Sequence, residues 1–573
     1  MKDFFSGFRK WHVVRVGIAY LVVAWLVVQL VNNVVVPLHL PDWTATFVIV
    51  VLAIGFPVSL VLAWAFQRTP EAAATKVVEA PLTVEKAPVA APAIETSERK
   101  VLANSVAVLP FENMSPKPED AYFAAGLHEE ILNRLAKISA LNVIARTSVL
   151  RYKDGPKPVP EIAKELNVQT VMEGSVRFAG ERVRVTTQLI DGATDLHLWS
   201  ETYERPLGDI FAIETDIAVN VANALQAALT PKEQSRVASK PTQSPAAYAF
   251  YLQSVEFEMT DDFLPAIQRL QKAVEIDPDF ALAYAKMASF QALSLINTTM
   301  TATSRPEERA ELEARLRRNI DRAIALDPDV PLAYSATGML ALIYWRWNEA
   351  ERAFARVIDA APNEEFPRRE YAYLLALTGR NAEALATAER AAELDPDNPN
   401  AGWYGFQLHL AGRHDEAAAV LQREIALHPA RSLPRNWLAF IEIARGRLDA
   451  AILQLEISER LVGSDISPAF LSEWALSYAR SGRRADAERL FARMKAAADN
   501  GVQPGAGGWA VAYLAIGDEA KALEWLEVGA KKAANHEPDE GYQNLLNLKL
   551  NVTNDPRLKK PEFANVLSRI KGD

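Results

Sequence analysis

A regular spacing of prolines constrains the second half of this 573-residue chain more than any other feature. Pro328, Pro362, Pro396 and Pro429 follow one another at intervals of 34, 34 and 33 residues. Proline does not fit inside a helix, so each of these residues marks a helix end. A period in this range is typical of a protein that stacks copies of one small helical unit.

A second set of markers continues after these prolines stop. Gly379, Gly412, Gly446, Gly482 and Gly517 recur at intervals of 33, 34, 36 and 35 residues, and an alanine follows each glycine five positions later. Glycine permits a tight turn between two antiparallel helices, and alanine lets the helices approach closely. Together the markers predict tetratricopeptide repeats over residues 247–536. About eight units are expected, beginning near residues 247, 281, 331, 365, 398, 432, 468 and 503.

Stacked helix pairs bury a continuous core and leave a concave surface, which we expect to bind a protein or peptide partner. The first helix of each unit should face this surface, with its fifth, ninth and twelfth positions pointing inward. The alternative is that some of these side chains pack between helices. The candidate partner-binding residues are Arg369, Tyr373, Phe406, His409, Asn436 and Phe440.

The amino-terminal part contains two long apolar runs. Residues 16–36 and 44–66 carry no charge, and at about 1.5 Å per residue each is long enough to cross a bilayer of roughly 30 Å. Lysine and arginine occur before the first run and after the second, whereas residues 37–43 have none. This pattern predicts two transmembrane helices, with residues 1–15 and the soluble domains cytoplasmic. The alternative of a cleaved secretory signal explains only the first run.

Residues 67–103 are rich in alanine and proline without a helical or strand period, which predicts a flexible linker. For residues 104–230 the pattern predicts an α/β layer domain of about five strands. The strands are expected at 105–110, 141–145, 170–178, 182–191 and 196–203, and the helices at 121–139, 159–166 and 210–229. The predicted fold is therefore multidomain, with two transmembrane helices, this α/β domain and an all-α repeat solenoid.

Five stretches of residues 104–230 carry a family resemblance. They are 105–115 (SVAVLPFENMS), 121–132 (AYFAAGLHEEIL), 143–148 (VIARTS), 173–176 (EGSV) and 198–203 (LWSETY). Together these stretches resemble the TolB amino-terminal-like (FlgO-like) domain of bacterial proteins. The apolar runs are similar to the paired-span anchor of inner-membrane members, which often carry tetratricopeptide repeats. The resemblance therefore implies a location in the bacterial inner membrane. Some relatives have a winged-helix or nucleotide-cyclase domain before the anchor, for which the residues preceding position 16 leave no room. Residues 537–573 resemble the closing segment of such arrays and are expected to cap the last repeat.

The sequence indicates no catalytic, cofactor or metal site. His128 and Glu129 begin a zinc-protease signature, but Leu132 stands where its second histidine is required. The sequence has no cysteine and no phosphate-binding loop, and its net charge of −10 argues against nucleic acid as a partner. We expect a non-enzymatic, membrane-anchored scaffold or sensor that binds a protein partner. The alternatives are an accessory of signalling or transcription related to cyclase and winged-helix repeat proteins, and a periplasmic envelope or transport accessory with inverted topology.

Overall fold

The structure is a computed structural model, and it describes Leu52 and residues 101–573 with short gaps. The gaps are 117–120, 154, 156, 180–181, 258–261, 302–305, 398–401, 464–466, 540–541 and 551–554. Contacts divide the protein into two compact units, Met1–Ser97 and Glu98–Asp573. Four predicted segments lie wholly or almost wholly outside the described residues. They are the segment 1–15, the span at 16–36, the span at 44–66 apart from Leu52, and the linker 67–103 apart from residues 101–103.

The prediction of an integral inner-membrane protein is corrected. In the described part of the sequence, no helix combines the length and the apolar character needed to cross a bilayer. The helices α10 (Ala281–Thr301) and α11 (Pro306–Leu326) have 21 residues each, but α11 is rich in arginine and glutamate. The predicted fold class with two transmembrane helices and the predicted inner-membrane localisation are therefore wrong by this finding.

Residues 102–206 build one mixed sheet. Its strand order is β3-β1-β4-β5-β6, and β2 pairs with β4. β1 runs parallel to β3 and β4, whereas β5 is antiparallel to both β4 and β6. The strands are β1 (Leu102–Val108), β2 (Glu112–Asn113), β3 (Asn142–Val143), β4 (Val168–Ala179), β5 (Arg182–Asp191) and β6 (His197–Pro206).

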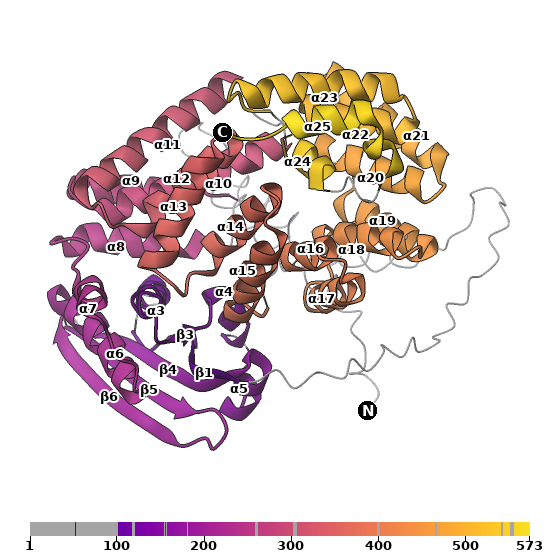
Figure 1. Cartoon of the computed structure of the whole chain (residues 1–573). Helices are drawn as coiled ribbons and strands as arrows, with labels where there is room; N and C mark the ends of the chain where they lie inside the picture. The colour runs from indigo at the N-terminus through magenta and orange to yellow at the C-terminus, as the bar shows by residue number, and fades with distance from the viewer. Residues whose placement is uncertain are drawn as a thin grey trace. The chain divides into compact units, whose positions relative to one another are not determined.

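Helices cover both faces of this sheet (Figure 1). On one face, α3 and α6 share a core with β4 and β5, in which Leu127, Ile131 and Val185 are fully buried. On the other face, α5 buries Ile162 and Leu166 against β1 and β4. The helices are α3 (Ala121–Leu135), α4 (Arg146–Val149), α5 (Val159–Leu166), α6 (Ile210–Ala224) and α7 (Pro231–Ala238), with short 3₁₀ turns at Leu150–Tyr152 and Leu207–Asp209.

The helices from α8 to α23 follow one another as eight pairs, as expected for a tetratricopeptide array (Figure 1). The first two pairs are α8 (Pro245–Ser254) with α9 (Leu264–Ile276), and α10 with α11, whose extra length takes up the long interval between Pro278 and Pro328. The remaining pairs are α12 (Pro331–Ile343) with α13 (Trp347–Ala360), α14 (Glu365–Leu377) with α15 (Asn381–Leu394), α16 (Gly402–Leu410) with α17 (His414–Leu427), α18 (Leu433–Ala444) with α19 (Leu448–Val462), α20 (Pro468–Arg480) with α21 (Arg484–Asp499), and α22 (Gly505–Ile516) with α23 (Glu519–Ala534).

The turn glycines explain how the later pairs close. Gly379, Gly412, Gly446, Gly482 and Gly517 all have φ between 74° and 84°, the left-handed region that L side chains avoid. In the turn between α12 and α13, Trp345 stands at the position that glycine has in these later turns, and its φ is 59°. A bulky residue in that conformation is strained, so other contacts must hold it there.

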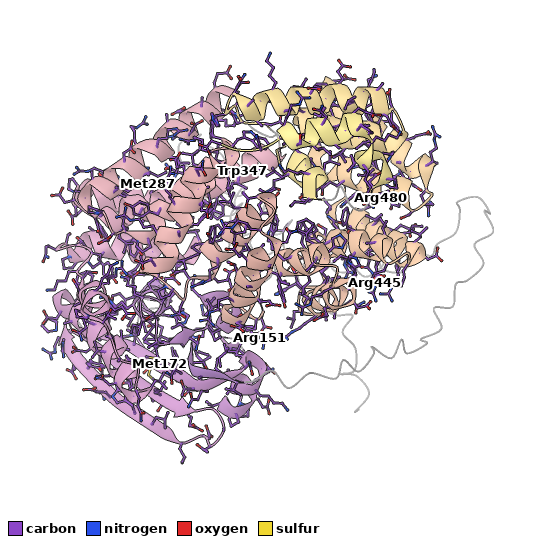
Figure 2. All side chains as sticks on the ribbon, in the orientation of Figure 1. Arg151, Met172, Met287, Trp347, Arg445 and Arg480 are labelled. Carbon is purple, nitrogen blue, oxygen red and sulfur yellow. The ribbon has the colours of Figure 1, made fainter. Side chains whose placement is uncertain are left out.

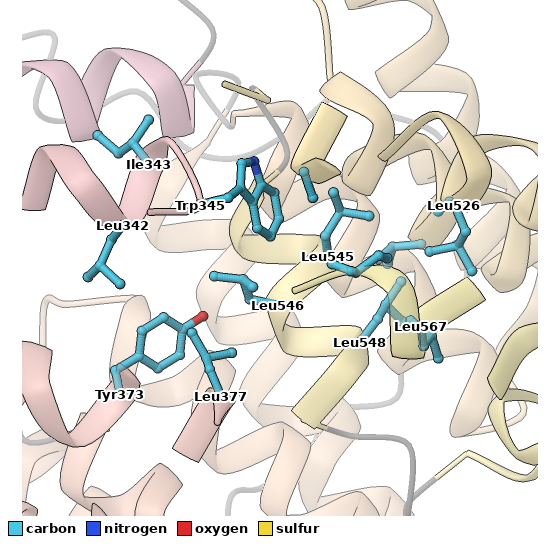
Figure 3. Close-up of a cluster of buried hydrophobic side chains, with 14 of the residues drawn as sticks. Leu342, Ile343, Trp345, Tyr373, Leu377, Leu526, Leu545, Leu546, Leu548 and Leu567 are labelled. Carbon is cyan, nitrogen blue, oxygen red and sulfur yellow. The ribbon is translucent and has the colours of Figure 1, made fainter. Parts of the chain in front are cut away.

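Those contacts come from the carboxyl-terminal segment. The Trp345 indole is fully buried, its Nε1–H donates to the carbonyl oxygen of Glu537 at 3.0 Å, and its own carbonyl accepts from the backbone N–H of Asp573 at 3.2 Å. Leu545 and Leu546 belong to the same hydrophobic cluster as Trp345 (Figure 3). Residues 537–573 contain α24 (Tyr542–Leu550), a 3₁₀ turn (Pro556–Lys559) and α25 (Pro561–Arg569). This segment contacts α22 and α23, and α24 also reaches α14.

Candidate functional site

The first helices of successive pairs enclose a cavity of about 990 Å³ within Glu98–Asp573. Its wall is built from α10, α12, α14, α16, α18, α20 and α22, which is the surface that a tetratricopeptide array presents inward. Elements outside the array also contribute. The helix α3 supplies Glu129 and Glu130, α4 supplies Arg146, and α24 supplies Asn544 and Asn547. The cavity is therefore an inner surface of the repeats that the α/β domain and the carboxyl-terminal segment border.

One helix position recurs along this wall. The residue nine places before the turn glycine lines the cavity in four consecutive pairs. Each of these side chains is half-buried, and they alternate in chemistry from charged to aromatic and back. They are Glu370, Trp403, Trp437 and Glu473.

The two tryptophans form an aromatic surface in the middle of this row. The rings of Trp403 and Trp437 lie 5.7 Å apart between centroids, and Tyr373 meets Trp403 edge-on at 4.9 Å. Gly402 makes room for them, because a Cβ atom there would stand 3.0 Å from Cδ1 of Trp437. Half-exposed tryptophans that are supported from behind are the side chains that most often anchor a bound polypeptide.

The six residues predicted from the sequence divide into two groups. Arg369, Asn436 and Phe440 line the cavity. Tyr373, Phe406 and His409 do not, because their side chains are buried between the helices with 4% or less of their surface exposed. The Phe406 and His409 rings pack on each other at 6.3 Å, so the structure places these residues in the core of the array.

The two tryptophans and Glu473 were not among the predicted residues. Counting from the unit starts selects Arg369 and Asn436, which line the cavity, and passes over the residues that follow them, Glu370 and Trp437, which line it as well. Counting backward from each turn glycine gives Glu370, Trp403, Trp437 and Glu473 directly. The glycine is the better reference because it fixes where the first helix ends.

Several charged groups on the cavity wall are paired with one another. Glu129 faces Arg146 at 3.6 Å and Lys286 at 3.8 Å. Arg369 lies 3.6 Å from Glu365 and 3.3 Å from Glu370. Burial raises the pKa of Glu365, although the Arg369 charge opposes the shift.

The α24 helix satisfies the last carboxylate of the row. Asn544 and Asn547 donate their side-chain amide hydrogens to Oε1 of Glu473 at 3.1 and 2.9 Å. Burial raises the pKa of Glu473, and these two hydrogen bonds act against it. On the side of the cavity near α24, the Glu473 carboxylate is therefore already bound by side chains of this protein.

The α/β domain is joined to the repeats by polar contacts beside the cavity. Asp395, at the end of α15, accepts hydrogen bonds from the hydroxyls of Thr147 and Ser148 on α4. Asp397 pairs with Arg151 at 3.0 Å. Arg151 is labelled in Figure 2. The backbone N–H of Ala145 also donates to the carbonyl of Leu394 at 2.8 Å. These contacts link the sheet domain to the fourth pair of repeat helices.

The described residues contain no cluster of three or more histidine, aspartate or glutamate side chains arranged to hold a metal ion. His128, which began the zinc-protease signature, instead has its Nε2 at 2.8 Å from the carbonyl oxygen of Val108 on β1. This contact gives His128 a structural place between α3 and the sheet.

No family model matches the sequence. A curated relative, the putative adenylate cyclase 3 of Rhizobium meliloti (strain 1021), is 40% identical over 202 residues. The match covers 35% of this protein and 34% of the relative, so it spans about a third of the length of the curated relative.

Solved structures resemble parts of the protein. YrrB, a TPR protein with an unusual peptide-binding site, is 20% identical with a TM-score of 0.25, covering 34% of this protein and 91% of its own length. A tetratricopeptide repeat protein from Parabacteroides merdae ATCC 43184 is 12% identical with a TM-score of 0.31, covering 44% and 93%. PilF of Pseudomonas aeruginosa is 13% identical with a TM-score of 0.28, covering 37% and 93%. The assignment of tetratricopeptide repeats rests on the helix pairs and turn glycines described above.

Proposed function

We propose that this protein is a non-enzymatic scaffold that binds a polypeptide partner in the cavity of its repeat array. The observation that supports this most is the row formed by Glu370, Trp403, Trp437 and Glu473, one half-buried side chain from each of four consecutive first helices. A row of this kind suits a ligand that extends along the stack, because each helix pair presents one contact to it.

The chemistry of the wall favours a protein ligand over a small charged molecule. The basic side chains Arg146, Lys286 and Arg369 each face a carboxylate of the same wall, so these three charges are balanced within the protein. The aromatic surface in the middle offers apolar area with a polar border, which is the usual arrangement of a protein interface.

A second candidate function is a role in cyclic-nucleotide signalling. The 40% identity over 202 residues to a putative adenylate cyclase is the observation that favours it. In this interpretation the array binds a cyclase or one of its regulators, and no residue of this protein acts on a nucleotide. The resemblance of residues 104–230 to the TolB amino-terminal-like domain belongs to the same proposal, as a domain that accompanies such repeats.

A comparative affinity purification tests the scaffold proposal. The full-length protein, its Trp437→Ala variant and its Leu453→Ala variant are each used to capture proteins from cells. Leu453 lies on α19 and is 51% exposed, so it controls for loss of an apolar side chain away from the cavity. We expect the partner captured by the original protein to be lost with Trp437→Ala and kept with Leu453→Ala.

A partner that binds all three forms equally contradicts binding in the cavity. An assay for cyclic AMP, run on the purified protein with ATP and Mg²⁺ or Mn²⁺, tests the absence of catalysis, and product formation above a heat-treated control contradicts it. Capture of a nucleotide cyclase that depends on Trp437 supports the signalling function.

A further inference from the structure

The strand β6 is a long edge of the mixed sheet. Within the described residues it pairs with β5 on one side and with no strand on the other (Figure 1). It has 10 residues, whereas β3 at the opposite edge has 2. Proteins normally protect such an edge with lysine, proline, a bulge or a covering element, because its free backbone groups can pair with another strand. The strand β6 contains no lysine, and most of its side chains are exposed.

The proline at the end of β6 shows which backbone groups face outward. Residues opposite each other in an antiparallel pair alternate between those that exchange two hydrogen bonds and those that exchange none. Pro206 lies opposite Arg182 and has no N–H, so this pair exchanges none. The pairs that do are then Val183–Arg205, Val185–Tyr203, Thr187–Glu201 and Leu189–Trp199. The backbone groups of Ser200, Thr202 and Glu204 therefore point away from β5.

These three outward N–H groups have no hydrogen-bond partner in the part of the chain that the structure describes. The carbonyl of Glu204 accepts from Nη2 of Arg182 at 3.0 Å, and a carbonyl oxygen can accept a second hydrogen bond. The side chains of Ser200, Thr202 and Glu204 are exposed, so this row is open to solvent. The edge thus offers a partner strand a run of donors and acceptors.

Apolar side chains gather at the beginning of the same edge. Leu196, just before β6, is 64% exposed, the largest value among the exposed large hydrophobic side chains of the described residues. Leu198 is 47% exposed and stands where the register between β5 and β6 shifts. Exposed apolar side chains beside an unpaired strand edge indicate a surface that another chain covers.

The positions of the two interruptions in β6 make the edge self-complementary. Two copies related by a two-fold axis would pair antiparallel, each residue opposite the one equally far beyond the axis. With the axis at Thr202, this residue meets Thr202 of the second copy, and Ser200 meets Glu204. Pro206, which has no N–H, then falls opposite Leu198, where the register shift already interrupts the ladder. All three free N–H groups of each copy therefore find a carbonyl.

Other positions of the axis are less favourable. An axis at Glu201 or Glu204 places two identical carboxylates directly opposite each other, which destabilises a strand pair. An axis at Tyr203 places Pro206 opposite Ser200, so the Ser200 carbonyl receives no donor.

The axis at Thr202 also pairs side chains of different kinds. Trp199 lies opposite Arg205 of the second copy, a combination that favours a cation–π contact, while Arg205 keeps its pairing with Asp216 at 2.7 Å. Glu201 lies opposite Tyr203, whose hydroxyl is a hydrogen-bond donor. The edge therefore suits a second copy of this protein.

We propose that the protein forms a homodimer in which two β6 strands pair antiparallel about Thr202. The sheets of the two copies then join into one continuous sheet, and the dimer presents two repeat arrays in one assembly. This inference does not depend on the scaffold function, because it uses the edge of the sheet and no residue of the cavity.

Disulfide crosslinking of the full-length protein tests the register, since the sequence has no cysteine of its own. Thr202→Cys should give a covalent dimer under mild oxidation, because the two Cα atoms would lie about 5.5 Å apart, within disulfide range. Ser200→Cys and Glu204→Cys should each crosslink at least about 10-fold more slowly alone, because each Cα would lie about 14 Å from its copy. A mixture of these two variants, equilibrated before oxidation, should crosslink readily.

A backbone change tests the hydrogen bonds. Thr202→Pro removes one outward N–H at a place where an edge strand tolerates proline, whereas Thr202→Ala keeps the N–H and is the matched control. In sedimentation equilibrium we expect Thr202→Pro to raise the dimer dissociation constant at least about 10-fold and Thr202→Ala at most about 3-fold. Circular dichroism checks that both variants fold, and if Thr202→Pro does not, the cysteine variants decide alone.

Three results would overturn the proposal. The protein could remain monomeric at every concentration tested. The dimer could persist in folded Thr202→Pro, or Ser200→Cys alone could crosslink as fast as Thr202→Cys, either of which places the contact elsewhere. Slow hydrogen–deuterium exchange of the Thr202 amide in a monomer would mean that another segment of the same chain covers the edge.

Discussion

A few buried polar residues stabilise the junction between the sheet domain and the first repeat. Arg134 on α3 pairs with Glu214 on α6 at 2.8 Å, and both side chains are 3% exposed or less. The hydroxyl of Tyr248 on α8 donates to the other oxygen of Glu214 at 2.6 Å. Burial raises the pKa of Glu214 to about 7, even though the Arg134 charge lowers it. The cluster therefore depends on each charge having its partner.

Replacing Arg134 by methionine should be strongly destabilising, because it leaves the Glu214 carboxylate buried without its cation. We expect a loss of about 3–5 kcal/mol in the free energy of unfolding measured in urea. The double variant Arg134→Met, Glu214→Leu removes both charges and should recover much of this loss. If the double variant is no more stable than the single one, the pair is not the source of the effect.

Close packing at one glycine makes a second residue-scale prediction. A Cβ atom at Gly338 on α12 would stand 2.5 Å from Cε1 of Phe354, a fully buried ring on α13. In Gly338→Ala we expect the clash to lower the free energy of unfolding by about 1–3 kcal/mol. The higher helix propensity of alanine should offset up to about 1 kcal/mol of this loss. Gly208→Ala, where nothing lies within 4 Å, is the matched control and should change the melting temperature little. Adding Phe354→Leu to Gly338→Ala should restore stability if the clash is the cause.

The buried carboxyl of Glu424 on α17 gives a pH dependence. Burial raises its pKa to about 8, against the lowering effects of Arg431 and of the Gly402 N–H. An unfolded glutamate has a pKa of about 4.3. When the pKa of a carboxyl group is higher in the folded protein than in the unfolded chain, its protonated form stabilises the folded state. Its contribution is therefore complete below about pH 4.3 and is lost as the pH rises toward about 8.

Glu424→Gln keeps the neutral form at every pH. We expect this variant to be more stable than the original protein at about pH 8, by about 1–3 kcal/mol in urea unfolding, with a much smaller difference at about pH 5. Glu416→Gln on the same helix is the control, because Glu416 is exposed. An equal gain at both pH values contradicts the titration of Glu424.

At the scale of elements, the helices and strands that could be predicted are those that short-range sequence patterns encode. The helix expected at 159–166 is α5, and the side chains of Val183, Val185 and Leu189 share the buried face that strand alternation predicts. The turn glycines marked the repeats because only a positive φ closes the turn. Trp345 was not recognised as the equivalent of a turn glycine, because its strained conformation is held by Glu537 and Asp573, far away in the sequence. Local patterns contain no information about such a distant contact.

A substitution of Trp345 therefore tests whether this residue holds the carboxyl-terminal segment 537–573 in place. Trp345→Gly relieves the backbone strain but removes a fully buried indole and its hydrogen bond to Glu537. Since truncating a buried tryptophan costs about 3–5 kcal/mol, we expect a net loss of stability. We also expect faster proteolytic cleavage within 537–573. The reverse change, Gly379→Trp in the next turn, has no such receiving site and should destabilise without altering that cleavage. If Trp345→Gly raises the melting temperature, turn strain outweighs the contact.

At the scale of the whole Glu98–Asp573 unit, the sheet domain and the repeats share one hydrophobic core. Leu127 and Ile131 of α3 belong to the same cluster as Tyr248 and Phe280 of the first repeats. A second junction lies at the end of α15, where buried Asp395 accepts from Thr147 and Ser148. The sequence suggested separate domains because composition and period change between them. It could not show that residues 248 positions apart meet.

The second junction should couple α4 to α15. Asp395→Ala leaves the hydroxyls of Thr147 and Ser148 without their acceptor, so we expect faster hydrogen–deuterium exchange in Arg146–Val149 and in the last turn of Asn381–Leu394 together. Exchange in Gly505–Ile516 should stay unchanged, because α22 belongs to the last helix pair of the array, far along the stack from α15. Glu383→Ala, an exposed position on α15, should leave both segments protected. If only α15 responds to Asp395→Ala, its hydrogen bonds stabilise the helix end alone, and the sheet domain is held to the repeats by the apolar core around Tyr248.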